Sequence, residues 1–466
     1  MAGKLKALFG AQDMTQGSPR KNIALFAAPL LIGNLAQQLY NTVDAVIVGQ
    51  YIGDGALAAV GASGPVLNLL LLLFMGIATG AGIMVAQYYG ARQRDMLSRS
   101  VGTCILLTLI SGIIIMIVGP LIAGPLMSLL RTPQDIYDMS VTYLTIIFLG
   151  MTGGGFYNIL AGVLRGMGDS VTPLLFLLVA CLLNIVLDIQ FVVSFNMGVA
   201  GVAWATIIAQ AVSALLCLVR LVLMKGQVDL NRHTLRLNRE MTLRTVRLGL
   251  PSGLTQAIFS MAALVVQALT NSFGTTVIAC SIVVMRVDGF AMMPNFTFGM
   301  AMTTFVGQNV GAGLLRRVDE GTREGMQMAL GVSFLLTLGI LFFGEYLMRL
   351  FTKTEEVVLL GMHMMRILAV GYIAMAVTQS LSGVMRGAGD TMTPMWISII
   401  TTVIIRVPIA YLWAFLTRTP ANPVGSPDCI FASLLISWVL GAVITVAAYR
   451  RGKWRGKGIT GVAAVE

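Results

Sequence analysis

The chain has 466 residues, of which 57% are hydrophobic and only 11% are charged, and its formal net charge at pH 7 is +11. Soluble domains carry about 25% charged residues. The composition therefore excludes a soluble enzyme and predicts an integral membrane protein.

Long uncharged segments indicate that the chain crosses the membrane many times. Residues 55–91 and 101–130, for example, contain no Asp, Glu, Lys or Arg, and each exceeds the roughly 20 apolar residues that a spanning helix requires. A transmembrane β-strand needs only about 10 residues, so the runs favour an all-α membrane fold. Twelve spans are predicted, near residues 22–45, 60–82, 100–122, 140–162, 172–194, 198–220, 247–270, 280–302, 325–345, 363–383, 394–416 and 428–449.

Polar side chains form a stripe along the first predicted span. Asn34, Gln37, Gln38, Asn41 and Asp44 lie three or four residues apart, except for the adjacent pair Gln37 and Gln38, which places them on one helix face. Hydrogen bonding between helices explains the amides. A carboxylate inside a span costs about 2.5–3.5 kcal/mol on insertion scales, so we predict that Asp44 has a functional role.

An octapeptide occurs twice in nearly the same form. Residues 162–169 read GVLRGMGD and residues 383–390 read GVMRGAGD, and each copy is followed by a Thr-Pro pair. Glycines permit a tight turn between helices, and the Arg and Asp can pair or cap helix ends. We favour this structural interpretation, with a direct transport role as the alternative.

The fifth and sixth predicted spans carry further oxygen ligands. Asn184 and Asp188 stand four residues apart and share a helix face. Thr206 lies on the next span, where its hydroxyl can contribute another oxygen. Together with Asp44 these residues form a set of hard oxygen donors, which suits a proton or Na⁺ rather than a soft metal. Helix packing is the alternative role for Thr206.

Basic residues divide the chain and orient it. A basic cytoplasmic linker at residues 225–247 separates an N-terminal lobe, residues 1–224, from a C-terminal lobe, residues 248–466, with six spans each. Of the 31 lysines and arginines, 24 fall on the side of the membrane that holds both termini. The positive-inside rule therefore predicts a multi-pass protein of the cell inner membrane with cytoplasmic termini. An even number of spans per lobe makes the internal repeat parallel.

The C-terminal lobe departs from the N-terminal pattern. Ile405 and Ile409 stand at the positions that are equivalent to Asn184 and Asp188. Asp288 is an acid within the eighth span, and a structural pair and a functional role remain equally open for it. Interfacial or internal pairing is expected for Arg366, His363 and Arg406. The many methionines are interpreted as core or lipid-facing filler, or alternatively as an adaptable wall for apolar cations.

These motifs resemble the MATE family of multidrug and toxin extrusion antiporters. The similarity extends from about Ile23 to Arg450 and is carried by the paired RGxGD loops, the Gln-x-x-Gly-Ala motifs at 87–91 and 308–312, and the polar first and fifth spans. The resemblance implies two six-helix bundles in a V with a central cavity. It also implies a cation site for H⁺ or Na⁺ at Asp44, Asn184, Asp188 and Thr206. Expected cavity residues are Gln37, Asn41, Gln256, Met285 and Met292.

The sequence therefore predicts a secondary antiporter that exports amphipathic cationic compounds by alternating access. The expected coupling ion is H⁺ or Na⁺, the expected state is a monomer in the bilayer, and no cofactor, other metal or nucleic-acid partner is expected. A lipid-linked saccharide flippase is the alternative, although such a protein should line its cavity with several arginines. A membrane enzyme is a further alternative, but the chain lacks a recognisable catalytic set or a phosphate-binding Gly-x-x-x-x-Gly-Lys-Ser/Thr loop.

Overall fold

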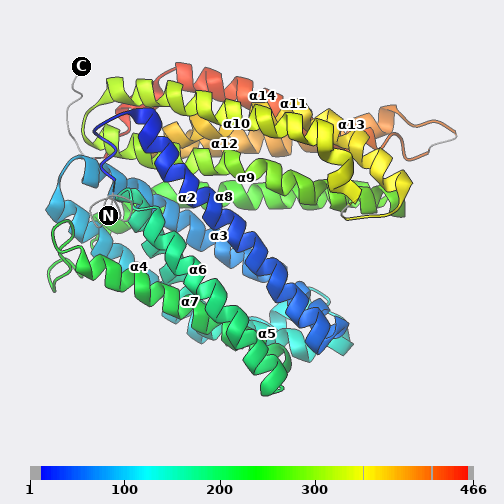
Figure 1. The fold of residues 1–466 in the computed structure, drawn as a ribbon, viewed down its shortest axis with the longest axis horizontal. Helices are drawn as coiled ribbons and strands as arrows, with labels where there is room; N and C mark the ends of the chain where they lie inside the picture. The colour runs from blue at the N-terminus through cyan, green and yellow to red at the C-terminus, as the bar shows by residue number, and fades with distance from the viewer. Residues whose placement is uncertain (1–11, 350, 421–422, 460–466) are drawn as a thin grey trace. The chain divides into compact units, whose positions relative to one another are not determined.

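The protein is all-helical, as the sequence predicted. The computed structural model describes residues 12–349, 351–420 and 423–459, without the side chains of Asn41 and Leu73 (Figure 1). Among these residues, twelve helices are long and apolar enough to cross a membrane. They are α2 (Pro19–Ile47, extended by a π-helical turn at Val48–Ile52), α3 (Asp54–Gly90), α4 (Arg94–Leu129), α5 (Gln134–Gly166), α6 (Val171–Ile189, extended by a π-helical turn at Gln190–Ser194), α7 (Gly198–Leu223), α8 (Arg239–Asn271), α9 (Thr275–Gly311), α10 (Leu315–Arg349), α11 (Glu355–Gly387), α12 and α13 (Met392–Ile399 and Val407–Leu416, joined by the π-helical segment Ile400–Arg406) and α14 (Asp428–Arg450).

Each predicted span lies within one of these helices, and most helices continue beyond it. Uncharged runs mark only the part of a helix that suits the bilayer, whereas backbone hydrogen bonding extends the helix into its charged ends. Helix α8 is an example, because it starts at Arg239, inside the segment expected to be a linker. Asn238 sets this start, since its side-chain oxygen accepts hydrogen bonds from the backbone N–H groups of Glu240 and Met241 at 2.9 and 3.2 Å.

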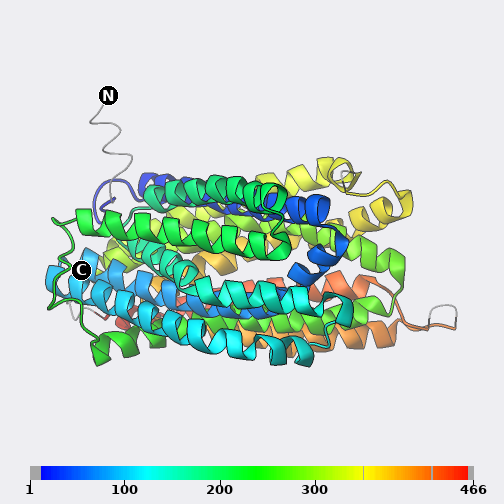
Figure 2. The ribbon, with the colours of Figure 1, turned by 90° about the horizontal axis from the view of Figure 1, so that it is seen from below.

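Contacts divide the chain into two compact units. Unit 1 contains the chain up to Met14 together with Ala28–Gly253, and unit 2 contains Thr15–Ala27 and the chain from Leu254. Within unit 1, α5 packs against α3, α4 and α7. Within unit 2, α11 packs in the corresponding way against α9, α10 and α14 (Figure 2). Of the three boundaries between the units, two fall inside the helices α2 and α8, and the third, between Met14 and Thr15, lies in a turn before α2.

The repeated octapeptide has the same packing role in both units. A Cβ atom on Gly162 of α5 would lie 2.6 Å from the backbone oxygen of Ala78 on α3, and a Cβ on Gly383 of α11 would collide with the backbone oxygen of Gly299 on α9. These glycines therefore allow two helix backbones to touch. Of the glycines in the first copy, Gly168 makes the turn itself, because its φ is +89°.

The aspartate of each octapeptide binds the first turn of the following helix. Asp169 accepts hydrogen bonds from the Thr172 backbone N–H at 2.9 Å and from the Thr172 hydroxyl at 2.7 Å. Asp390 is bound by Thr393 in the same way, at 3.3 and 2.7 Å. These contacts satisfy an N–H group that the helix itself leaves unpaired. The basic partner of Asp169 is Arg220 on α7, rather than the arginine of its own motif.

Candidate functional site

The two predicted coupling carboxylates stand at similar places on their helices. Asp44 lies in the last turn of α2 and is followed by the π-helical turn Val48–Ile52, and Asp188 lies in the last turn of α6 and is followed by the π-helical turn Gln190–Ser194. The two π-helical turns contact each other. Such turns occur often at functional sites, because the wider backbone ring redirects side chains.

The structure brings the four residues of the predicted cation site together within unit 1. The carboxyl groups of Asp44 and Asp188 lie within hydrogen-bonding reach of each other. The hydrogen-bonding groups around Asn184 determine the orientation of its side-chain amide. In this orientation the amide nitrogen donates to Asp188 Oδ2 at 2.9 Å, and the amide oxygen accepts from the Thr206 backbone N–H at 3.2 Å. Asn184 and Asp188 are both fully buried. Asn184 therefore fixes the position of the Asp188 carboxyl against α7.

Three side-chain oxygens of this cluster are buried and unpaired. Asp44 Oδ1, Asp188 Oδ1 and Thr206 Oγ1 have no hydrogen-bond partner within the described part of the chain. They come from three different helices, α2, α6 and α7. A buried polar atom without a partner costs about 1–3 kcal/mol, so the fold maintains this cluster at the expense of stability. Such oxygens can be satisfied chemically by a proton shared between the carboxyls or by a small hard cation.

Two tyrosines complete the cluster and were not identified from the sequence. The Tyr40 hydroxyl lies beside Thr206 and close to both carboxyls, and the Tyr143 hydroxyl lies close to both carboxyls from α5. Tyr40 precedes Asp44 by four residues, and this spacing indicates that the two side chains share a helix face. Tyr40 could therefore have been identified from the sequence. Tyr143 gave no such signal, because only the packing of α5 places it there.

The expected cavity residues belong to three helices, α2, α8 and α9. Gln37 and Gln256 are half-buried, on α2 and α8, and the Asn41 side chain lies outside the described residues. Met285 of α9 is 58% exposed, whereas Met292 is 6% exposed and belongs to the core of unit 2. The two methionines are seven residues apart and so share a face of α9, of which only the Met285 position is exposed.

A second group of polar residues lies in the core of unit 2. The Asp288 carboxyl of α9 lies close to the Tyr372 hydroxyl of α11, and Arg406 is its charged neighbour. Arg406 ends the π-helical segment Ile400–Arg406. Asp288 thus has a basic charge nearby, whereas the electrostatic neighbours of Asp44 and Asp188 among the described residues are each other. Of the other two basic residues with an expected pairing, His363 lies 3.1 Å from Asp428 at an exposed position.

Comparisons with known proteins agree on one family. The MatE family model matches twice, at residues 29–190 and 251–412. "Probable multidrug resistance protein YoeA" of Bacillus subtilis is 27% identical over 96% of this chain and 97% of that protein, and "Probable multidrug resistance protein NorM" of Thermotoga maritima is 26% identical over 84% and 85%. In fold, the chain matches a structure described as the outward-facing conformation of a multidrug resistance MATE family transporter. That match has a TM-score of 0.87 at 24% identity, over 95% of this chain and 97% of the other.

Proposed function

The chain belongs to the MatE family of multidrug efflux transporters, and we propose that it exports amphipathic, cationic compounds in exchange for H⁺ or Na⁺. It is a multi-pass membrane transporter and not an enzyme. In our proposal Asp44 and Asp188 hold the coupling ion, with Asn184 and Thr206 as supporting ligands. The expected cavity residues and the cytoplasmic placement of both termini belong to the same proposal.

The observation that carries this proposal is the set of three unpaired oxygens in unit 1. Two carboxyl groups in apolar surroundings repel each other when both are ionised, so they favour the uptake of one positive charge. A proton can bridge Asp44 and Asp188. Na⁺ can instead bind Asp44 Oδ1, Asp188 Oδ1 and Thr206 Oγ1, which are hard oxygen ligands from three helices.

Ion binding at these oxygens would couple to transport through the helices that carry them. Occupation draws α2, α6 and α7 together, and release lets the carboxylates repel each other. An ion shifts a conformational equilibrium only by the difference between its affinities for the two states. Linkage then requires that substrate weakens ion binding by the same factor by which the ion weakens substrate binding.

Gradient-driven efflux from vesicles tests the proposal. Asp44→Asn and Asp188→Asn should each abolish ethidium efflux under an imposed pH or Na⁺ gradient, because an amide neither gains a proton nor carries the charge that attracts Na⁺. Asp54→Asn is the matched control, since Asp54 is exposed at the start of α3. Full efflux by both site variants would refute the coupling role.

The same vesicles separate the proposal from its alternative. A lipid-linked saccharide flippase should move a lipid-linked sugar and leave ethidium in place. The buried carboxylates of unit 1 do not suit a pyrophosphate, which they would repel. The two relatives described above are both named as multidrug resistance proteins, so the flippase alternative is not favoured.

A further inference from the structure

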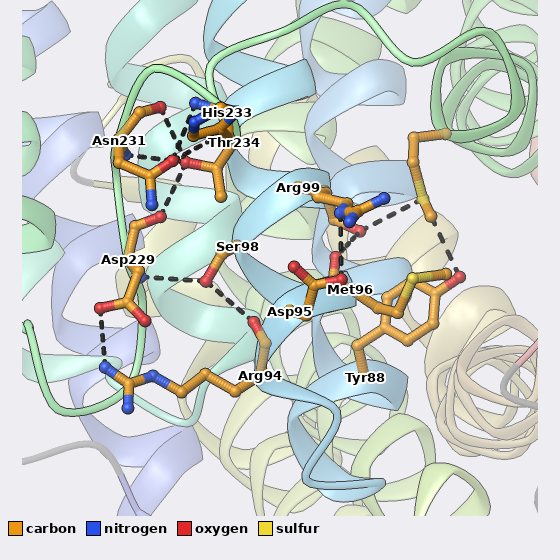
Figure 3. A network of polar contacts seen from close by, with 12 residues as sticks. Tyr88, Arg94, Asp95, Met96, Ser98, Arg99, Asp229, Asn231, His233 and Thr234 are labelled. Carbon is orange, nitrogen blue, oxygen red and sulfur yellow. Dashed lines mark hydrogen bonds and ion pairs between the residues drawn. The ribbon is translucent and has the colours of Figure 1, made fainter.

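The segment between α7 and α8 is held firmly against unit 1. Asp229 forms an ion pair with Arg94 of α4 at 2.7 Å, and its backbone N–H donates to Ser98 Oγ at 2.9 Å (Figure 3). Within the segment, the side chains of Asn231 and Thr234 bind each other's backbone N–H groups at 3.0 and 2.8 Å. The segment is therefore a fixed loop on α4 rather than a free tether.

The contacts of this loop also determine its depth. Thr234 lies against Gly102, where a Cβ atom would collide with the Thr234 backbone oxygen, and the Thr103 hydroxyl donates to the Arg236 backbone oxygen at 3.2 Å. Gly102 and Thr103 begin the uncharged run of α4, residues 101–130. At 1.5 Å per residue this run covers about 45 Å, which is the thickness of the hydrocarbon core together with both headgroup regions. The length of this run therefore predicts that the loop lies at the level of the lipid headgroups.

At this level the loop exposes basic and apolar side chains in alternation. Leu235 and Leu237 are 38% and 51% exposed, and Arg232, Arg236 and Arg239 are exposed beside them. The acids of the segment are engaged elsewhere, because Asp229 pairs with Arg94 and Glu240 pairs with Arg244. The three arginines therefore keep their positive charge available to an outside partner.

We propose that Arg232, Leu235, Arg236, Leu237 and Arg239 form a docking surface for anionic phospholipid in the adjacent leaflet. The arginines bind lipid phosphates, since basic residues next to a membrane surface are attracted to anionic headgroups. The leucines enter the boundary between headgroups and acyl chains, as the apolar side chains of interfacial segments do. Water alone would solvate the arginines but would leave the apolar leucine side chains unfavourably exposed. A bilayer is therefore the partner that suits both kinds of side chain. The surface anchors the start of α8 in the leaflet and goes beyond the proposed transport function.

A fluorescent probe on the loop tests this directly. The probe is attached to Leu237→Cys in a Cys181→Ser background, because the other four cysteines are buried. The full chain is reconstituted into neutral vesicles with either brominated phosphatidylglycerol or brominated phosphatidylcholine at equal mole fraction. We expect quenching titrations to show the anionic lipid enriched at the probe by about fivefold or more, the factor that one arginine near the surface supports. Equal quenching by the two lipids would overturn the proposal.

Charge variants show whether these arginines are responsible. The triple variant Arg232→Gln, Arg236→Gln, Arg239→Gln should remove the enrichment. A control variant with the same loss of charge, Arg316→Gln, Arg450→Gln, Arg451→Gln, should keep it. Enrichment that survives the loop variant, or that disappears equally in the control, contradicts the proposal.

A comparison of depths does not depend on any charge variant. Bromine near the headgroup end of the acyl chain should quench the Leu237 probe more than bromine near the chain terminus. A probe at Arg316→Cys, which precedes the uncharged run of α10 by nine residues, should be quenched by neither. A Leu237 probe that no brominated lipid quenches would place the loop in water and overturn the docking surface.

Discussion

The carboxyl groups of Asp44 and Asp188 lie within hydrogen-bonding reach of each other, on helices that are separated in the chain by α3, α4 and α5. Their approach leaves one oxygen of each carboxyl buried without a partner among the described residues. Asn184 holds the other oxygen of Asp188 at 2.9 Å. This arrangement suits a site that alternately gains and loses a small positive ion.

Asn184→Ala should weaken the affinity for the coupling ion. The substitution removes the hydrogen bond to Asp188 Oδ2 and frees the carboxyl to change its rotamer. Loss of a hydrogen bond to a charged group costs about 1.5–3 kcal/mol, which corresponds to roughly 10- to 150-fold in affinity. Efflux measured against the concentration of the driving ion should show a raised half-saturation concentration. Ser63→Ala, a buried polar change elsewhere in unit 1, should leave that concentration unchanged.

Asp169→Ala should destabilise the protein without uncoupling transport. The aspartate binds the first turn of α6 through Thr172 and pairs with Arg220 at 3.3 Å. Loss of a helix-terminal hydrogen bond of this kind costs about 1 kcal/mol, so thermal unfolding in detergent should occur at a lower temperature. The Asp169→Asn variant keeps an acceptor for the Thr172 N–H, so its unfolding temperature should fall less. A change in ion dependence with unchanged stability would show that the motif acts in transport.

Gly162→Ala and Gly383→Ala should destabilise their units to a similar degree. Each added methyl group would strike the backbone of the facing helix, α3 or α9. Overpacking of this kind costs about 1–3 kcal/mol, and thermal unfolding of each variant measures it. Gly331→Ala is the control, because a Cβ at that exposed position of α10 meets nothing within 4 Å. Equal stability of all three variants would contradict the close packing of α5 on α3 and of α11 on α9.

Asp288→Asn should reduce stability more than the double change Asp288→Asn, Arg406→Gln. The charges of Asp288 and Arg406 lie near each other without a direct hydrogen bond at Asp288 Oδ1 or Arg406 Nε among the described residues. Removing one charge leaves the other uncompensated, which costs stability, and removing both charges avoids that penalty. Thermal unfolding of the single and double variants measures the difference, and Arg406→Gln alone closes the cycle. Additive effects of the two changes would show that Asp288 and Arg406 do not interact.

Much of the architecture could be predicted because hydrophobic runs and repeats are local signals. Asp44 and Asp188 were identified from their isolation in apolar spans, which the membrane makes conspicuous. Tyr143 was missed because its place in the cluster depends on the packing of α5. The glycines of the octapeptide were interpreted as turn residues, whereas Gly162 serves the contact between α5 and α3. No local pattern distinguishes these roles, since both require only the absence of a side chain.

The central claim is that Asp44 and Asp188 hold an ion that substrate displaces, and the most direct measurement is ion release from the purified protein on substrate addition. A weakly buffered sample with a pH indicator reports protons, and a parallel sample loaded with radioactive Na⁺ reports sodium. Addition of ethidium should release one of these ions from the wild-type chain and from the control variant Asp54→Asn. It should release neither ion from the double variant that combines Asp44→Asn and Asp188→Asn. Equal release by the double variant, which keeps neither carboxylate, would contradict the account.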